Sequence, residues 1–163
     1  MIIWIMGLSG SGKSTLGIIL KKKLQKRYKL VHLDGDALRK IYNDKLGHTL
    51  KDREINAERI SKLTKFLSEQ KINIIVSVLS NFPKWLKWNR RNLKNYHEIY
   101  LKTEMNILKK RRKKLYLEKI KNVIGMDLKF NYPINPDFKI VDGNSLITLN
   151  KEADKIIKKL KIN

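Results

Sequence analysis

A glycine-rich stretch near the amino terminus holds the first residues that could do chemistry. Residues 7–14, "GLSGSGKS", fit the pattern G-x-x-x-x-G-K-[ST], in which backbone N–H groups point at phosphate oxygens. The lysine can reach the β- and γ-phosphates, and the next hydroxyl can ligate Mg²⁺. A chance turn is the alternative, but here the motif follows an apolar run and precedes a helix-like one, as it must. The stretch predicts a nucleoside triphosphate site with Mg²⁺. The predicted phosphate-binding residues are Gly7, Leu8, Ser9, Gly10, Ser11, Gly12, Lys13, Ser14 and Thr15.

Two aspartates flank a glycine in "LDGDALR", residues 33–39. If the apolar run before them is a parallel strand, its carboxyl end faces the same crevice as the glycine-rich stretch. Asp34 and Asp36 could then hold a hydrated Mg²⁺ and accept a proton from an attacking hydroxyl. The structural alternative is that Asp36 caps a helix beginning at Ala37, which would not need Asp34. We predict Asp34 and Lys13 as catalytic residues, and Ser14 and Asp34 as the metal ligands.

The glycine-rich stretch alone does not separate a GTPase, a motor ATPase and a small-molecule kinase. The guanine-specifying tetrad Asn-Lys-x-Asp is absent from the sequence. A motor ATPase normally needs a longer chain than 163 residues. These observations favour a kinase.

The elements that must position these residues alternate along the chain. Apolar, strand-like runs occupy 2–6, 30–33, 72–79, 98–101 and 138–141. Apolar residues recur at helical spacing in three groups, which are Leu16, Ile19, Leu20 and Leu24; Ile60, Leu63, Phe66 and Leu67; and Leu149, Ile156, Ile157 and Leu160. Wholly apolar strands separated by helices predict a parallel sheet of about five strands covered on both sides, a three-layer α/β/α fold. We expect one domain over 1–163, with a lid-like segment at about 111–137.

The composition limits partners and location. The chain has no cysteine, which excludes disulfides and cysteine metal sites. Its formal net charge of +22 suggests nucleic acid, a small polyanion, or lysines that decorate a solvated surface. The densest basic runs, 21–23 and 109–114, lack interleaved aromatic residues, so nucleic acid is disfavoured as the main ligand. The apolar start is too short for a signal peptide or a membrane span, so we expect a cytoplasmic protein with no membrane partner.

Five segments in order resemble the adenylylsulfate (APS) kinase family from residue 2 to about residue 140. They are "GLSGSGKST", "LDGDALR", "DREINAER" (52–59), "LS" (79–80) and the segment 125–137 from "GMDLKF" to "NPD". Members of that family are P-loop kinases that use MgATP to phosphorylate the 3′-hydroxyl of adenylyl sulfate, and they are commonly dimers. The resemblance implies a homodimer and a catalytic role for Asp34. It implies acceptor-binding roles for Asp36, Arg39, Arg53, Asn56, Ser80, Lys121, Asp127 and Phe130. For Arg53 and Arg59, the alternative is an exposed, salt-bridged helix face.

The sequence departs from the family where the acceptor base is bound. The family stacks adenine between two phenylalanines, and these positions read His48 and Val123 here. Pro83 replaces the family's arginine in "SNFP", and the lid motif is reduced to "RRKKLY", from which Arg111 or Arg112 could contact the ATP phosphates. Loss of an aromatic clamp removes roughly 1–3 kcal/mol of stacking per aromatic face.

We therefore expect the reaction type to be retained and the acceptor base to differ. The chain looks most similar to the divergent branch of the family that phosphorylates cytidine diphosphoramidate at its 3′-hydroxyl in bacterial capsule modification. Two alternatives stay open: an adenylyl-sulfate kinase, and a nucleic-acid-binding ATPase or polynucleotide kinase. A non-catalytic regulator is disfavoured because Lys13, Ser14 and Asp34 are all present.

Overall fold

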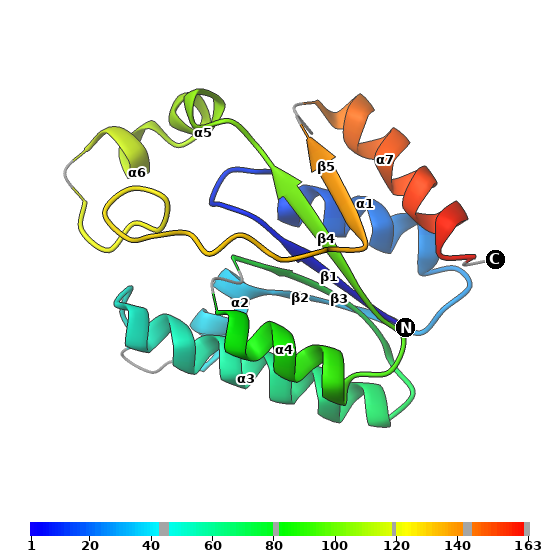
Figure 1. Cartoon of the computed structure of the whole chain (residues 1–163). Coiled ribbons are helices and arrows are strands. Elements are labelled where there is room, and N and C mark those ends of the chain that lie inside the picture. Colours follow the sequence, from blue (N-terminus) through cyan, green and yellow to red (C-terminus); the bar gives the residue numbers. More distant parts are fainter. Residues whose placement is uncertain (43–45, 80–81, 119, 142–144, 162–163) are drawn as a thin grey trace.

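A five-stranded parallel sheet forms the centre of the molecule (Figure 1). The computed structural model describes residues 1–42, 46–79, 82–118, 120–141 and 145–161. The strands are β1 (Ile2–Met6), β2 (Leu30–Asp34), β3 (Asn73–Val78), β4 (Tyr96–Lys102) and β5 (Phe138–Val141). They lie in the order β2-β3-β1-β4-β5, and every neighbouring pair is parallel. The predicted parallel sheet of about five strands is confirmed.

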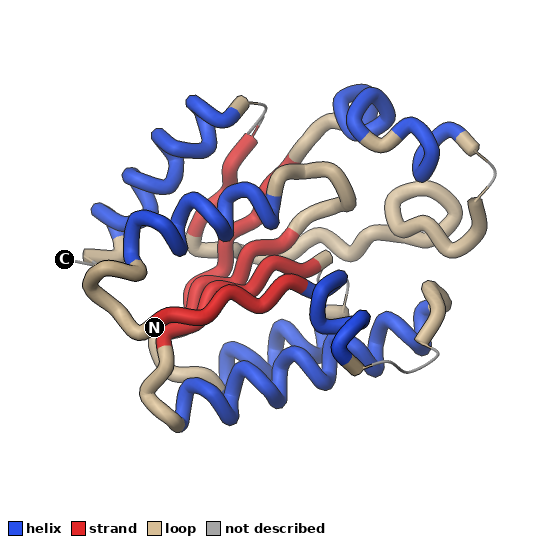
Figure 2. The backbone as a smooth tube through the Cα atoms, turned by 180° about the vertical axis from the view of Figure 1, so that it is seen from behind, coloured by secondary structure: helices blue, strands red, loops and turns tan. Residues whose placement is uncertain are grey.

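Helices cover both faces of this sheet, which gives three layers (Figure 2). On one face lie α1 (Lys13–Leu24) and α7 (Leu146–Lys159). On the other lie α2 (Gly35–Ile41), α3 (Leu50–Glu69) and α4 (Pro83–Asn92). Two short helices, α5 (Met105–Arg111) and α6 (Lys113–Leu117), follow the carboxyl end of β4. No helix in the described ranges is long and apolar enough to cross a membrane.

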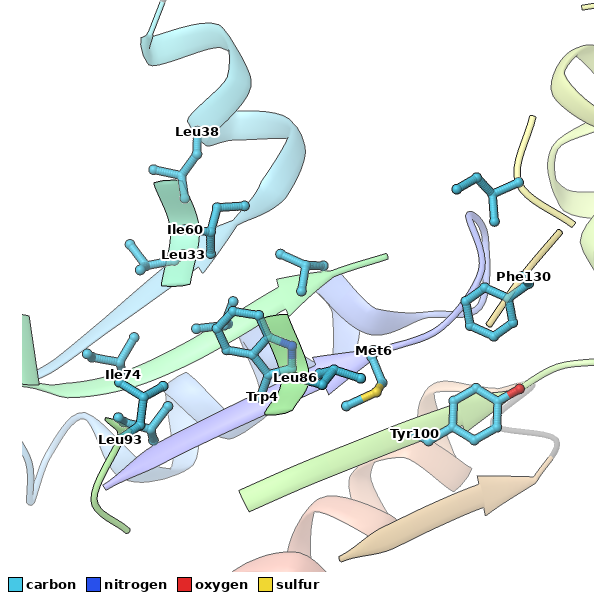
Figure 3. Packing of buried hydrophobic residues seen from close by; sticks show 14 residues of the cluster. Trp4, Met6, Leu33, Leu38, Ile60, Ile74, Leu86, Leu93, Tyr100 and Phe130 are labelled. Carbon is cyan, nitrogen blue, oxygen red and sulfur yellow. The ribbon is translucent and has the colours of Figure 1, made fainter. Parts of the chain in front are cut away.

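The central strand β1 is apolar throughout because it is buried on both faces. Side chains alternate across a strand, so Ile3 and Ile5 pack beneath α1 and α7. Trp4 and Met6 point the other way and pack with Leu86 of α4 (Figure 3). All five residues of β1 are buried. A strand with two covered faces cannot alternate between polar and apolar residues, which explains the continuous apolar run.

The predicted core faces of α1 and α7 are confirmed, because Leu16, Leu20, Leu149 and Ile156 are buried. The prediction for α3 is wrong at one position: 59% of Phe66 is exposed to solvent. The buried face of α3 includes Ile60 and Thr64, and Leu67, partly buried, packs against the core cluster that contains Ile60. Phe66 lies about 100° around the helix from Leu67, which takes it outside that face.

The segment predicted as a lid, residues 111–137, contains α6 and then continues as a loop with a tight turn. Gly125 adopts φ 92°, a left-handed conformation that glycine reaches without strain, and its N–H donates to the carbonyl of Leu128. Ile124 and Phe130 are buried in the same core cluster as Trp4 and Met6. This part of the segment is therefore anchored to the core of the molecule.

Candidate active site

The glycine-rich loop joins β1 to α1 and leaves the start of that helix open. Gly12 is the residue that caps α1 at φ 97°, and it has no side chain that could occupy the N–H groups of the first turn. At Gly7, a Cβ atom would lie 2.6 Å from the carbonyl oxygen of Leu101, so only glycine fits there. No acidic residue lies in the first turn of α1. The exposed N–H groups and the positive end of the helix dipole can therefore bind an anion.

Lys13 is the first residue of α1, and its side chain folds back over the loop. Its Nζ donates to the carbonyl oxygen of Leu8 at 2.8 Å. Burial lowers the pKa of Lys13 to about 8, the charges of Asp36 and Asp34 oppose this shift, and Arg112 adds to it. A phosphate bound on the loop would supply the negative charge that keeps the lysine protonated.

Asp34 connects the end of β2 to the glycine-rich loop. The Ser14 hydroxyl donates to its Oδ2 at 2.5 Å. Its Oδ1 accepts from the backbone N–H of Asp36 at 3.0 Å and of Ala37 at 3.3 Å, which makes Asp34 the cap of α2. The alternative in which Asp36 caps a helix beginning at Ala37 is therefore wrong, because α2 begins at Gly35. One oxygen of Asp34 holds the helix, and the other faces Ser14.

The donor set at this point fits Mg²⁺. Mg²⁺ prefers oxygen ligands and is usually held by one or two carboxylates together with substrate phosphates and waters. Ser14 and Asp34 bring a hydroxyl and a carboxylate oxygen within 2.5 Å of each other. In the part of the chain that the structure describes, no three His, Cys, Asp or Glu residues form a metal-binding group. Ser14 and Asp34 would hold a magnesium ion whose other ligands come from a bound nucleotide and water.

Two polar side chains of the sheet, Ser77 and His32, support the first turn of α1 on the side that faces the strands. The Ser77 hydroxyl, on β3, donates to the backbone carbonyl of Lys13 at 3.1 Å, and it lies 2.9 Å from Nε2 of His32 on β2. Burial lowers the pKa of His32, which favours its neutral ring. Sequence reasoning missed both residues. Each is a polar side chain in a largely apolar strand, and this could have indicated that both residues have polar partners near the carboxyl end of the sheet.

A cleft of about 570 Å³ lies above these residues. The predicted residues that line it are Ser9, Gly10, Gly12, Lys13, Ser14, Thr15, Asp34, Asp36, His48, Arg53, Arg112 and Val123. The structure adds residues from the start of α7 and from α6 that were not predicted, which are Leu115, Tyr116, Ser145, Leu146 and Leu149. The residues at the start of α7 come after the carboxyl end of β5. Ligands of parallel sheets bind beyond the carboxyl ends of the strands, so this position could have indicated that these residues line the cleft.

Side chains of the segment after β4 donate hydrogen bonds to backbone carbonyls of the glycine-rich loop. Arg111 donates from Nη1 to the carbonyl of Gly10 at 3.0 Å. The Tyr116 hydroxyl donates to the carbonyl of Ser9 at 2.8 Å. Arg112 lies against Gly10, where a Cβ atom would come within 2.9 Å of its Cγ. Both arginines line the cleft, so two cations face the place where a triphosphate would lie.

Arg53, on α3, joins two loops on the other side of the cleft. Its Nε donates to the carbonyl of His48 at 2.9 Å, and its Nη2 donates to the carbonyl of Asn122 at 3.0 Å. The alternative of a salt-bridged helix face is wrong for Arg53, because these partners are carbonyl oxygens. Arg59 instead lies over the ring of Tyr42, 5.0 Å from its centroid.

His48 and Val123 both line the cleft, as their predicted role requires. His48 is largely exposed, but the partial desolvation of its ring lowers its pKa, and the charges of Arg53 and Arg39 add to this effect, which favours the neutral imidazole. Val123 is held through its backbone, because Asp127 accepts from its N–H and from that of Asn122, each at 2.6 Å. Asp127 therefore positions this loop and does not itself line the cleft.

Several predicted residues lie away from the cleft. Gly7, Leu8 and Ser11 belong to the loop but do not line it, and Ser11 is fully buried. Lys121 is exposed outside it. The structure does not bring Phe130 to the cleft, because its ring is buried beside Tyr100 with centroids 6.2 Å apart (Figure 3). Arg39 and Asn56 line a smaller adjacent cavity. Ser80 lies outside the described residues.

A glycine-rich loop that opens a helix, with a carboxylate at the end of a strand two places away in a parallel sheet, is the arrangement of a P-loop kinase. The model of the adenylylsulphate kinase family matches residues 1–141. The chain belongs to this family, as the sequence motifs indicated.

Full-length similarity supports the same class. A protein of Campylobacter jejuni named cytidine diphosphoramidate kinase is 40% identical to this chain, over 98% of this chain and 95% of its own. A probable adenylyl-sulfate kinase of Pyrococcus abyssi is 32% identical over 98% and 94%. The solved APS kinase of Mycobacterium tuberculosis, in complex with AMPPNP and APS, has a TM-score of 0.87 at 28% identity, covering 98% of this chain and 96% of that one. The chain is a phosphotransferase that acts on a hydroxyl group.

Proposed function

We propose that this kinase transfers the γ-phosphate of MgATP to the 3′-hydroxyl of cytidine diphosphoramidate. The observation that carries the reaction type is the contact between Ser14 and Asp34, which joins the phosphate-binding loop to a carboxylate at the acceptor side. The acceptor is supported by the 40% identity to the Campylobacter jejuni enzyme along nearly the whole chain. His48 and Val123, in place of an aromatic clamp, agree with a pyrimidine acceptor.

The residues of the cleft suit an in-line transfer. The N–H groups at the start of α1 bind the phosphates of ATP, and Lys13 exchanges the carbonyl of Leu8 for a phosphate oxygen. Ser14 and Asp34 would hold Mg²⁺, which would supply positive charge to offset that of the ATP phosphates. The acceptor 3′-oxygen forms a bond to the γ-phosphorus while the bond to the ADP oxygen breaks. Asp34 orients the hydroxyl and takes up its proton.

The base end of the acceptor meets a small polar surface. A neutral imidazole carries one donor and one acceptor nitrogen, and the lowered pKa of His48 favours that state. The pairing edge of cytosine also carries donor and acceptor groups, as does that of adenine. Val123 lines the cleft, although only 4% of it is exposed, and it is a small apolar side chain in place of an aromatic ring. The replacement of both aromatic rings, rather than this hydrogen-bonding pattern, is what argues against adenine.

The segment 111–137 serves as a lid over this site in our proposal. Arg111 and Tyr116 attach it to the phosphate-binding loop, and Arg53 attaches it to α3. A lid that excludes water limits transfer of the phosphoryl group to water. We expect ATP hydrolysis in the absence of acceptor to be far slower than transfer.

A comparison of acceptors tests the proposal. The purified protein is supplied with MgATP and either cytidine diphosphoramidate or adenylyl sulfate, and kcat/KM is measured for each. We expect a preference of at least about tenfold for the cytidine compound, which corresponds to about 1.4 kcal/mol. Comparable values, or a preference for adenylyl sulfate, would contradict the acceptor assignment and favour an adenylyl-sulfate kinase, the activity named for the Pyrococcus abyssi relative.

Adding an oligonucleotide tests the alternative that this positively charged protein acts on a polynucleotide. If the net charge of +22 reflected a polynucleotide substrate, ATP consumption would rise with added oligonucleotide. We expect it to depend on the mononucleotide instead.

A further inference from the structure

Tyr116 lies in the short helix α6, and its hydroxyl contacts the phosphate-binding loop. It donates to the carbonyl oxygen of Ser9 at 2.8 Å. Only 3% of Tyr116 is exposed, and it belongs to a small core cluster with Leu108 and Val123. A ring that is fixed by close packing places its hydroxyl at one point. The hydrogen bond to Ser9 is therefore made at a defined position on the loop.

The hydroxyl of Tyr116 is a donor over the whole pH range of an ordinary assay. Burial raises the pKa of Tyr116 to about 12, and Arg112 and the hydrogen bond to Ser9 oppose this shift. The phenol therefore keeps its proton near neutral pH. Its partner is a backbone carbonyl, which can only accept a hydrogen bond.

This hydrogen bond sets the orientation of the peptide unit that joins Ser9 to Gly10. In a trans peptide the carbonyl and the N–H point in opposite directions. Because Tyr116 holds the carbonyl of Ser9, the N–H of Gly10 faces away from Tyr116. Ser9 and Gly10 both line the cleft, and no backbone acceptor in the described part of the chain takes that N–H. It is available to an oxygen of a ligand.

Gly10 does not fix this orientation by itself. It adopts φ 84°, and glycine populates positive and negative φ about equally, so the peptide unit could rotate without a steric penalty at residue 10. A rotated unit would turn the carbonyl oxygen of Ser9 toward the phosphates, where it would repel them and a donor would be lost. The next carbonyl, that of Gly10, accepts from Arg111 at 3.0 Å. Two consecutive carbonyls of the loop are thus held by side chains of the segment after β4.

We propose that Tyr116 is a positioning residue for ATP, whose hydroxyl holds the carbonyl of Ser9 so that the N–H of Gly10 faces the phosphates. The residue acts through the backbone of the loop and touches none of the reacting atoms. This inference rests on one part of the proposed function, the binding of MgATP by the loop, and does not depend on which acceptor is used.

The Tyr116→Phe variant tests this role, because it keeps the ring in its packing site and removes only the hydroxyl. We expect KM for ATP to rise about five- to tenfold, while KM for the acceptor stays the same, since only the ATP side of the cleft loses a donor. The matched control is Tyr100→Phe, which removes the hydroxyl of another buried tyrosine that does not line the cleft. It should leave KM for ATP at the wild-type value. An unchanged KM for ATP in Tyr116→Phe would overturn the proposal.

Tripolyphosphate shows where the affinity is lost, because it carries phosphates and no nucleoside. Its inhibition constant in competition with ATP is measured for the wild type and for Tyr116→Phe. We expect this constant to rise by about the same factor as KM for ATP. A constant that stays the same while KM for ATP rises would place the lost contact at the nucleoside and overturn the role of Tyr116. Thermal melts complete the comparison: a lower Tm together with an equal rise in both KM values would assign the hydroxyl to the stability of the fold and also overturn the proposal.

The wild-type measurements separate this inference from the proposed function. If the wild type uses ATP and Tyr116→Phe behaves in the same way, the role of Tyr116 is wrong and the proposed function stands. If the wild type prefers adenylyl sulfate, the acceptor assignment is wrong, and the role of Tyr116 is measured with that acceptor. If the wild type neither uses ATP nor is inhibited by tripolyphosphate, the proposed function and the role of Tyr116 are both wrong.

Discussion

Asp34 caps a helix and, in the proposed mechanism, also takes up the proton of the acceptor. Its Oδ1 caps α2, and its Oδ2 accepts the hydroxyl of Ser14. A carboxylate fixed by a helix terminus cannot rotate away from the reacting atoms. The cap therefore orients the second oxygen toward the phosphate-binding loop.

Two substitutions at Asp34 separate these tasks. Asp34→Asn keeps an oxygen for the cap and removes the negative charge, so we expect kcat to fall at least about 100-fold with little change in Tm. Asp34→Ala removes both, so it should lose activity and also about 1 kcal/mol of stability. Steady-state kinetics and thermal melts measure the two effects. Near-normal kcat in Asp34→Asn would remove the catalytic assignment.

Lys13 gives the site a dependence on pH. Its pKa of about 8 in the free protein lies below the ordinary 10.5. A bound polyphosphate raises this pKa, so between these two values the complex holds more protons than the free protein. We expect affinity for ATP to fall as the pH rises through about 8. Calorimetry near pH 8.5 in two buffers of different ionisation enthalpy should show proton uptake on binding.

The matched variant for this titration is Lys13→Met, which has no proton to gain. It should bind ATP more weakly at all pH values and show no uptake near pH 8.5. Uptake of the same size in the variant would assign the titration to another group.

At the scale of elements, the start of α1 depends on the strands beneath it. Ser77 holds the carbonyl of Lys13, and His32 contacts Ser77. Gly17 leaves the space that these two side chains occupy, since a Cβ atom there would lie 2.7 Å from the Ser77 hydroxyl and also meet the His32 ring. The position of Lys13 is thus set by two neighbouring strands.

Gly17→Ala tests this support. Alanine is the better helix former by about 1 kcal/mol, but the added methyl group overpacks a tight site, which costs roughly 1–3 kcal/mol. We expect a lower Tm and weaker ATP binding. Ile18→Ala, at a half-exposed neighbouring position, is the control and should change neither by much. A Gly17→Ala protein that is more stable than wild type would contradict the close packing.

The strands and the phosphate-binding loop were predictable from sequence because both depend on local patterns. A strand buried on both faces is apolar throughout, and the glycines of the loop have fixed spacing. Phe66 was misplaced because helical spacing does not say where the centre of the buried face lies. Phe130 was assigned to the acceptor, yet tertiary packing against Tyr100 buries it. The smaller cavity beside the cleft was predictable only in part: the family motifs supplied Arg39, Arg53 and Asn56, whereas no local pattern indicated Trp85.

At the scale of the whole molecule, the excess of basic residues attracts anionic substrates. A net charge of +22 creates a positive field around a cleft that receives two polyanions. Such a field acts beyond individual contacts and is screened by salt within about 10 Å at 0.1 M.

Ionic strength tests this effect. We expect kcat/KM for the acceptor to fall between about 20 and 300 mM salt, because steering weakens, while Tm rises as self-repulsion is screened. Potassium chloride titrations of initial rate and melting temperature measure both. A kcat/KM that does not depend on salt would show that the charge has no part in substrate capture.

The hydrogen bonds that position residues 48, 122 and 123 are made to their backbone atoms, so the side chains at these positions can change without loss of those bonds. Arg53 donates hydrogen bonds to the carbonyls of residues 48 and 122, and Asp127 accepts hydrogen bonds from the N–H groups of residues 122 and 123. Every residue type except proline supplies the same carbonyl and amide atoms. If His48 contacts the acceptor base as we propose, a mutation at position 48 can change the base contact while these backbone hydrogen bonds remain. Because the loops are held through backbone atoms, a kinase of this family could change its acceptor through single substitutions. Positions 48 and 123 are therefore the first to vary in a redesign of acceptor choice.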